Sequence, residues 1–304
     1  MTDRPRRARR VQLSTPGSSE KMIQKAAESK ADHVFLDLED AVAPSQKRAA
    51  RAKIVQGLKS LDWRGKTRCV RINDLTTEYA FEDIIEIVEG AGEHLDTIMM
   101  TKVLTPADVL FADKLLHQLE RKLKLKRRIG LEALIEEVEG MQNVDAIARS
   151  TPRLECLVFG MGDFSASMGV TNKNVGETDG YPGDIWHYAR FRLVMACRAA
   201  GIDPVDGPYA DFRNSQGYRT ECERSMTLGC VGKWAIHPSQ IDIALEVYSP
   251  KPADVARARR LEKAYAEAEA QGLGAINVDG VMVDVASIRI LRNTVLNKAD
   301  LYGM

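Results

Sequence analysis

The sequence predicts a (β/α)₈ barrel followed by a C-terminal extension. Short runs of β-branched and other apolar residues alternate with longer segments of helical periodicity along most of the chain. Eight such runs are present, and none is followed by the G-x-G-x-x-G pattern of a dinucleotide-binding fold. Repeated strand–helix alternation of this kind favours a barrel over a doubly wound sheet, which is the alternative architecture.

The eight predicted strands share a short apolar core bounded by polar or helical segments. They are VQLS from Val11, HVFLDL from His33, TRCVRI from Thr67, TIMMTKV from Thr97, IGLEALIE from Ile129, LECLVFG from Leu154, DPVDG from Asp203 and GKWAIH from Gly232.

Helix-start signals lie between the strands. Thr105 offers an N-cap, Pro106 follows in the first turn, and Asp108 places an acid where the helix dipole favours it. Pro44 and Ser45 open another predicted helix. These signals predict a helix after the second strand and another after the fourth.

The chain is predicted to have three parts. Residues 1–10 are expected to form a disordered basic arm, residues 11–250 the catalytic barrel, and residues 251–304 an extension that serves as a lid or an oligomer contact. Within the extension, a helix is expected from about Ala253 to Gln271, a hairpin turning at Asp279 and Gly280, and a last helix from about Val285. Asp-Gly is a pair that readily adopts a type I′ turn.

Composition narrows the classes of function. The 304 residues are 44% hydrophobic and 28% charged, with 43 basic and 43 acidic side chains, so no net charge draws the protein to nucleic acid or to an anionic membrane. No run of apolar residues is long enough to cross a bilayer. The five cysteines form no C-x-x-C pair and are odd in number, which favours a reducing, cytoplasmic compartment. The arginine-rich start lacks the apolar segment of a secretory signal.

Barrel enzymes place their chemistry at the carboxyl ends of the strands. Acids, one arginine, one lysine and one histidine stand at these predicted ends. The polar residues found there are Asp37, Glu39, Asp40, Arg71, Asn73, Lys102, Glu136, Glu137, Asp163, Asp206 and His237.

Two of these acids, Glu136 and Asp163, follow neighbouring strands and form a half-site of hard oxygen ligands that suits Mg²⁺, with Mn²⁺ as the alternative. The metal would leave positions for a chelating 2-oxo acid and would polarise its carbonyl group. Zinc is disfavoured, because His237 stands without a second histidine or a cysteine. The alternative interpretation is that both acids pair with Lys or Arg across the barrel mouth.

Arg71, Lys102 and His237 each have a functional and a structural interpretation. The guanidinium of Arg71 suits a carboxylate or a developing enolate oxygen, but it could equally form an ion pair with Asp37 or Glu39. A salt bridge is expected for Lys102 in preference to a Schiff base, which would need a depressed pKa. For His237, a positional or hydrogen-bonding role is expected in preference to general base catalysis.

Seven motifs appear in order along the chain: SxPGS near the start, FLDLEDAVAP from Phe35, VRIN from Val70, LIE from Leu134, GxxDFSASMG from Gly160, DGPYADF from Asp206 and GKWAIHPSQ from Gly232. With these motifs the chain resembles the citrate lyase β-subunit-like family of the HpcH/HpaI aldolase superfamily. Within that family it looks most like the malyl-CoA and β-methylmalyl-CoA lyases. The resemblance extends from about residue 11 to the C-terminus.

The resemblance implies roles for individual positions. Glu136 and Asp163 match Mg²⁺ ligands, and Arg71 matches an arginine beside the substrate carbonyl and thioester oxygens. Gly162, Ile236 and His237 match substrate contacts, whereas Ser14, Ser19 and Lys25 fall where coenzyme A binds. Asp284 matches a catalytic acid that the C-terminal lid delivers to a neighbouring subunit, in trimers or hexamers.

The implied function is a Mg²⁺-dependent, reversible Claisen lyase that joins or separates acetyl-CoA or propionyl-CoA and glyoxylate. A malyl-CoA thioesterase and a citramalyl-CoA lyase remain as alternatives on the same scaffold, and a non-catalytic interaction subunit is the alternative of another class. The chain departs from its close relatives at three places. Ser14 and Ser19 stand where those lyases carry Phe and Arg, Thr101 replaces a proline, and the glycine-rich loop over residues 169–184 could reshape the acyl pocket.

Overall fold

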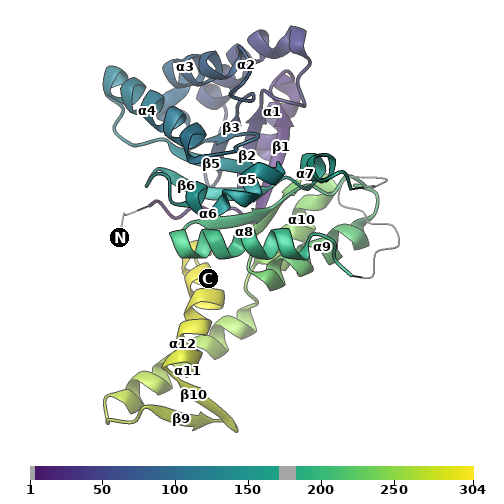
Figure 1. Cartoon of the computed structure of the whole chain (residues 1–304). Helices are drawn as coiled ribbons and strands as arrows, with labels where there is room; N and C mark the ends of the chain where they lie inside the picture. The colour runs from purple at the N-terminus through teal and green to yellow at the C-terminus, as the bar shows by residue number, and fades with distance from the viewer. Residues whose placement is uncertain (1–3, 171–182) are drawn as a thin grey trace. The chain divides into compact units, whose positions relative to one another are not determined.

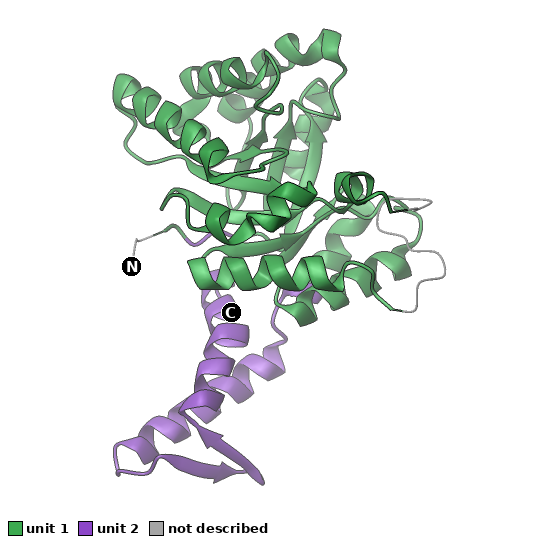
Figure 2. Ribbon diagram, viewed as in Figure 1, with its two compact units in different colours: residues 1–5, 9–246 green, residues 6–8, 247–304 purple. Residues whose placement is uncertain are grey.

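The structure is a computed structural model that describes residues 4–170 and 183–304. Two compact units divide the chain, one made of residues 1–5 and 9–246 and the other of residues 6–8 and 247–304 (Figure 2). The boundary after residue 246 lies close to the predicted boundary after residue 250. No helix among the described residues is long and apolar enough to cross a membrane.

Unit 1 is a closed barrel of eight parallel strands in chain order, as the sequence predicts (Figure 1). The strands are β1 (Val11–Pro16), β2 (His33–Asp37), β3 (Thr67–Arg71), β4 (Thr97–Met100), β5 (Gly130–Ile135), β6 (Leu154–Phe159), β7 (Asp203–Asp206) and β8 (Gly232–Ala235). Strand β1 pairs with both β2 and β8, which closes the barrel.

Helices follow the strands. They are α1 (Glu20–Glu28), η1 (Pro44–Gln46), α2 (Lys47–Ser60), α3 (Ala80–Ala91), η2 (Gly92–His94), α4 (Pro106–Leu123), α5 (Val138–Gln142), α6 (Val144–Ala148), α7 (Met161–Met168), α8 (His187–Ala200), α9 (Ser215–Leu228), η3 (Pro238–Gln240) and α10 (Ile241–Tyr248). Thr105 and Asp108 form a capping box at the start of α4, so the predicted start signal is confirmed.

Unit 2 contains the predicted helix, hairpin and final helix. It comprises α11 (Pro252–Glu269), β9 (Ala275–Val278), β10 (Val281–Asp284), α12 (Val285–Leu291), the π-helical turn η4 (Arg292–Leu296) and α13 (Asn297–Tyr302). Asp279 and Gly280 both have positive φ, at 55° and 82°, as a type I′ turn requires. A small apolar cluster of Leu261, Tyr265, Val283 and Ile288 holds the hairpin and helices of this unit together.

The prediction of a disordered arm over residues 1–10 is wrong for the residues that the structure describes. Arg9 is buried in the barrel, where its guanidinium contacts Glu132, Glu155 and Asp203 at 2.8–3.2 Å. Arg10 forms an ion pair with Asp32. The arginine-rich start thus supplies the cation for three acids at the amino ends of the strands.

We predict that Arg9→Ala lowers the free energy of unfolding by about 3–5 kcal/mol, because the substitution leaves buried carboxylates without their cation. Arg64→Ala is the matched control, since the one ion pair of Arg64 among the described residues is with Asp62 at the surface, and such pairs add little. Urea denaturation of both variants measures the difference. An Arg9→Ala protein as stable as the control would show that the buried network is dispensable.

Candidate active site

Five charged side chains meet at the carboxyl ends of β2 to β6. Glu39 follows β2, Arg71 ends β3, Lys102 follows β4 and Glu136 follows β5. Asp163 lies in the first turn of α7, directly after β6. The sequence predicted that all five stand at strand ends, and the parallel barrel brings them together at one end.

Arg71 is held by two carboxylates. Its Nε and Nη2 donate to Oδ1 and Oδ2 of Asp37 at 2.7 and 2.6 Å, and Nη1 lies 3.0 Å from Oε2 of Glu39. The structural interpretation of Arg71 is therefore confirmed. Because Nη1 and Nη2 each carry a second N–H, the same guanidinium can still donate to a substrate oxygen. The neighbouring carboxylates raise the pKa of Arg71 despite its burial, so the side chain stays charged.

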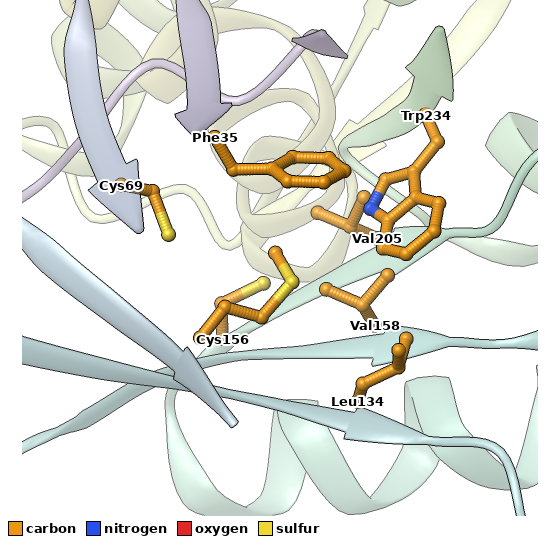
Figure 3. Close-up of a cluster of buried hydrophobic side chains, with 8 residues drawn as sticks. Phe35, Cys69, Leu134, Cys156, Val158, Val205 and Trp234 are labelled. Carbon is orange, nitrogen blue, oxygen red and sulfur yellow. The ribbon is translucent and has the colours of Figure 1, made fainter. Parts of the chain in front are cut away.

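The guanidinium of Arg71 also lies over two aromatic rings. Its central carbon lies 5.7 Å from the ring centroid of Phe35 and 5.4 Å from that of Trp234. These two rings lie beside each other in the apolar core cluster, with their centroids 4.8 Å apart (Figure 3). These rings, together with the carboxylates of Asp37 and Glu39, fix the orientation of Arg71.

Lys102 connects two of the acids. Its Nζ lies 2.5 Å from Oε1 of Glu39 and 3.7 Å from Oδ2 of Asp163. The salt bridge predicted for Lys102 is present, and the carboxylates raise its pKa, which disfavours a Schiff-base role. Its backbone has a positive φ of 49°, and in this conformation its N–H donates to Oε1 of Glu136 at 2.9 Å.

Glu136 is the most perturbed acid of the site. It is 4% exposed, and among the described residues its only hydrogen-bond donor is the backbone N–H of Lys102. Burial, reinforced by the negative charges of Asp163 and Glu39, raises the pKa of Glu136 to about 8. A buried carboxylate beside a second carboxylate is an environment that a cation stabilises.

The pair of Glu136 and Asp163 fits a hard divalent cation. No cationic side chain within residues 4–170 and 183–304 is bound to Glu136. Asp163 is 43% exposed, so its carboxylate faces the mouth of the barrel. Carboxylate oxygens with open positions for water or substrate are what Mg²⁺ takes in enzymes. In the part of the chain that the structure describes, the alternative pairing of these acids with Lys or Arg is found only for Asp163, through its long contact with Lys102.

A second group of potential metal ligands lies inside the barrel but suits a metal poorly. His33, Cys69 and Glu132 are all buried and close together. Glu132 already accepts hydrogen bonds from Arg9, Gln12, His33 and Thr97, and burial raises the pKa of the Cys69 thiol well above its usual value. This cluster is part of the structural network around Arg9.

Asp206 ends β7, as the sequence predicts, but it does not belong to the candidate site. It is completely buried, where Lys233 and Arg190 contact its carboxylate at 2.5 and 3.0 Å. These cations lower the pKa of Asp206 against the effect of burial. The residue is therefore a structural anchor between β7, β8 and α8.

The remaining predicted positions of unit 1 lie on four different parts of the barrel. Gly162 precedes Asp163 in α7, whereas Ile236 and His237 follow β8 and are exposed. Ser14 is half-buried in β1, and Ser19 is the N-cap of α1, where its hydroxyl accepts the N–H of Met22. Lys25 is exposed on α1. No contact in the structure tests their binding roles, which stay predictions.

Asp284 is the N-cap of α12 in unit 2. Its Oδ1 accepts hydrogen bonds from the backbone N–H and the hydroxyl of Ser287, both at 2.8 Å. These bonds lower the pKa of its carboxyl group. The capping interpretation is confirmed, and the catalytic interpretation stays a prediction.

A cavity of about 790 Å³ borders the site at Lys102, and its wall includes Asp74, Leu104, Glu137, Gln142 and Ser167. Neither Glu136 nor Asp163 lines this cavity. The glycine-rich loop that was expected to shape the acyl pocket falls largely on residues 171–182, which lie outside the described residues.

Two supports of the site were missed by the sequence analysis. The backbone N–H of Lys102 reaches Glu136 only because the residue adopts a left-handed conformation, for which the side chain gives no signal. A Cβ atom at Gly160 would lie 2.5 Å from Cβ and 2.7 Å from Oε2 of Glu136. The glycine in the GxxDF motif was the signal that could have indicated this close approach.

The sequence of this chain matches a known protein family. Residues 10–238 match the family model described as HpcH/HpaI aldolase/citrate lyase. The chain belongs to this family, as the sequence motifs predicted.

Individual relatives are similar over almost the whole chain. L-malyl-CoA/β-methylmalyl-CoA lyase of Rhodobacter capsulatus is 43% identical over 295 residues, which cover 94% of this chain and 93% of the relative. The mitochondrial citramalyl-CoA lyase of Homo sapiens is 33% identical, with 94% and 84% covered. Among solved structures, the protein CitE of Mycobacterium tuberculosis in complex with magnesium, acetoacetate and coenzyme A is 27% identical and superposes with a TM-score of 0.75 over 96% of this chain and 98% of that one.

We predict that Gly160→Ala weakens Mg²⁺ binding about tenfold or more, since the added methyl group collides with the fixed Cβ of Glu136 and displaces the carboxylate. Gly169→Ala serves as a control for glycine replacement, because a Cβ there meets no atom of the described residues within 4 Å, although its positive φ costs some stability. Titration calorimetry with MgCl₂ compares the two. Equal Mg²⁺ affinity in Gly160→Ala and wild type would contradict the role assigned to this glycine.

Proposed function

We propose that the protein is a Mg²⁺-dependent acyl-CoA lyase that reversibly cleaves a malyl-CoA-type thioester into glyoxylate and acetyl-CoA or propionyl-CoA. The observation that carries the proposal is the buried Glu136 beside Asp163 at the carboxyl ends of the strands. The names of the relatives and the magnesium and coenzyme A in the CitE complex support it.

Glu136 and Asp163 would hold the metal, which when bound would polarise the carbonyl of the 2-oxo acid as a Lewis acid. Arg71 would donate its remaining N–H groups to the thioester oxygen, where negative charge develops as the enolate forms. Since Asp37, Glu39 and the two aromatic rings fix Arg71 in advance, little reorganisation is needed during the reaction. Ser14, Ser19 and Lys25 would contact coenzyme A, and Gly162, Ile236 and His237 the substrate.

Asp284 would remove the proton from the acyl carbon in the condensation direction. Glu136 and Asp163 suit this step poorly, because a carboxylate bound to Mg²⁺ is a weaker base. Unit 2 would act as a lid that brings Asp284 to the site of a neighbouring subunit in a homotrimer or homohexamer. Exclusion of water by the closed lid would raise the pKa of Asp284 from the lowered value of its capping state.

We propose a reducing, cytoplasmic location, which the state of the cysteine thiols supports. All five cysteines are free and buried, and no disulfide joins any of them.

The direct test is incubation with malyl-CoA and Mg²⁺. We expect glyoxylate and acetyl-CoA as products, no activity in EDTA, and recovery when Mg²⁺ is restored. Asp163→Asn should have the same effect as EDTA, whereas Asp62→Asn, in an exposed ion pair with Arg64, should match wild type. Malate and free coenzyme A as the products would indicate a thioesterase, and full activity after exhaustive chelation would refute the metal-dependent mechanism.

Arg71→Lys is expected to lower turnover by about 10²–10³-fold, because lysine keeps the charge but loses the planar fork that binds Asp37 and the substrate together. Arg153→Lys is the matched control, since Arg153 is also buried and paired with two acids, Asp113 and Glu120. Steady-state kinetics and thermal unfolding of both variants separate catalysis from stability. Similar turnover in the two variants would leave Arg71 a structural residue only.

Asp284→Asn distinguishes the cap from the base. Asparagine caps helices as well as aspartate does, so the variant should unfold at the wild-type temperature, whereas turnover should be lost if the carboxylate is the base. Unchanged turnover would assign Asp284 to capping alone.

Mixed oligomers test whether the site is shared. Asp284→Asn and Asp163→Asn subunits should each be inactive alone, but co-expressed oligomers would contain sites with an intact metal ligand and a neighbour's intact lid. We expect recovered glyoxylate release in purified mixed oligomers. Its absence in verified mixtures would place lid and metal site in the same chain.

A further inference from the structure

Thr101, the residue after β4, carries a hydroxyl group that has no hydrogen-bond partner among the described residues. The oxygen atom is buried, and the whole side chain is only 1% exposed. A buried hydroxyl without a partner destabilises a folded protein, because the group has lost its hydrogen bonds to water. In a native structure such a group needs a reason, and a ligand that completes the hydrogen bond provides one.

Strand alternation places Thr101 among the residues of the candidate site. Side chains two positions apart on a strand point to the same side, so the residue two positions after a core residue faces the inside of the barrel nearer the carboxyl ends. After the core residues Phe35, Cys69, Met99 and Leu134 of strands β2 to β5, these residues are Asp37, Arg71, Thr101 and Glu136. Three of the four form the candidate site or hold it in place, and Thr101 is the fourth.

Thr101 lies between two functional parts of the site. Strand β4 pairs with β3, which ends at Arg71, and with β5, which leads to Glu136. The peptide group that joins Thr101 to Lys102 donates its N–H to Oε1 of Glu136 at 2.9 Å. A ligand that reaches from Glu136 to Arg71 therefore lies next to Thr101.

The ligand that fits this place is an anion with oxygen acceptors. In the proposed function, Glu136 holds the metal that binds the 2-oxo acid, and Arg71 contacts the thioester oxygen. The 2-oxo acid must lie between them, since its carbonyl carbon forms or breaks the bond to the acyl carbon. Its carboxylate and carbonyl oxygens accept hydrogen bonds but donate none, whereas a hydroxyl can donate.

We infer that the hydroxyl of Thr101 donates a hydrogen bond to an oxygen atom of the 2-oxo acid substrate. This inference rests on the proposed function for the identity of the ligand. It assigns Thr101 as a substrate-binding residue, whose hydroxyl lowers the stability of the free protein and gains its partner when the 2-oxo acid binds.

Titration calorimetry with glyoxylate, in the presence of saturating MgCl₂, tests the inference separately from catalysis. Thr101→Val replaces the hydroxyl with a methyl group and should weaken glyoxylate binding about tenfold, as expected for the loss of one hydrogen bond to a charged group. Thr101→Ser keeps the hydroxyl and should bind within about threefold of wild type. Mg²⁺ affinity without glyoxylate should stay within about twofold of wild type in both variants, because the hydroxyl is not a metal ligand.

Thermal unfolding without ligand separates a binding role from a structural role. Thr101→Val should unfold at the wild-type temperature or above it, because the substitution removes a buried hydroxyl that has no partner in the described part of the chain. Thr97→Val is the matched control from the same strand. Thr97 is also buried, but its hydroxyl donates to Oε1 of Glu132 at 3.1 Å. This control should unfold at a lower temperature and should keep the wild-type affinity for glyoxylate.

Glyoxylate affinity in Thr101→Val within about twofold of wild type would overturn the inference. Equal losses of glyoxylate affinity in Thr101→Val and Thr101→Ser would also overturn it, because they would indicate a packing effect. So would a loss of Mg²⁺ affinity as large as the loss of glyoxylate affinity, since the hydroxyl would then bind the water shell of the metal. Glyoxylate binding that depends on the hydroxyl, in a protein that does not cleave malyl-CoA, would refute the proposed function and leave this inference standing.

Discussion

Burial of the Glu136 carboxylate is the constraint from which the rest of the site follows. A carboxylate taken out of water is destabilised unless it is protonated or neutralised by a cation, and here burial together with Asp163 and Glu39 raises its pKa to about 8. The nearby cationic side chains already form ion pairs with other acids. Arg71 is bound by Asp37 and Glu39, and Lys102 is bound by Glu39. A divalent cation bound by Glu136 and Asp163, as we propose, would take the place of this proton and neutralise both carboxylates.

The surrounding chain keeps this pocket in shape. Gly160 leaves room for Glu136 where a side chain would collide with it, and the left-handed backbone of Lys102 directs its N–H to the same carboxylate. Arg71 packs against Phe35 and Trp234. Both rings belong to the apolar core cluster that Figure 3 shows. At the opposite ends of the strands, the network around Arg9 neutralises buried acids without any metal. At the amino ends of the strands, Arg9 thus pairs with buried acids, whereas at the carboxyl ends no cationic side chain of the described residues is bound to Glu136.

Most of the fold and the members of the site could be predicted from the sequence, because both depend on local patterns. Strand and helix periodicity, the cap at Thr105 and the turn at Asp279 are encoded within a few residues, and polar residues at strand ends gave Glu136 and Asp163. The errors arise from contacts between distant segments. Arg9 resembled part of a solvated basic arm because its partner Glu132 lies far along the chain, and Asp206 resembled a site residue because the sequence does not reveal its pairing with Lys233.

The pH dependence of Mg²⁺ binding tests the central claim most directly. Because the raised pKa of Glu136 is about 8, the metal must displace a proton below that pH. Mg²⁺ affinity should therefore rise as pH increases from about 6 to about 8 and level off above, with release of about one proton per ion at the lower pH. Glu136→Gln, which has no proton to lose there, should bind weakly and without this pH dependence. A wild-type affinity that is constant over this range, with no proton released, would contradict the account.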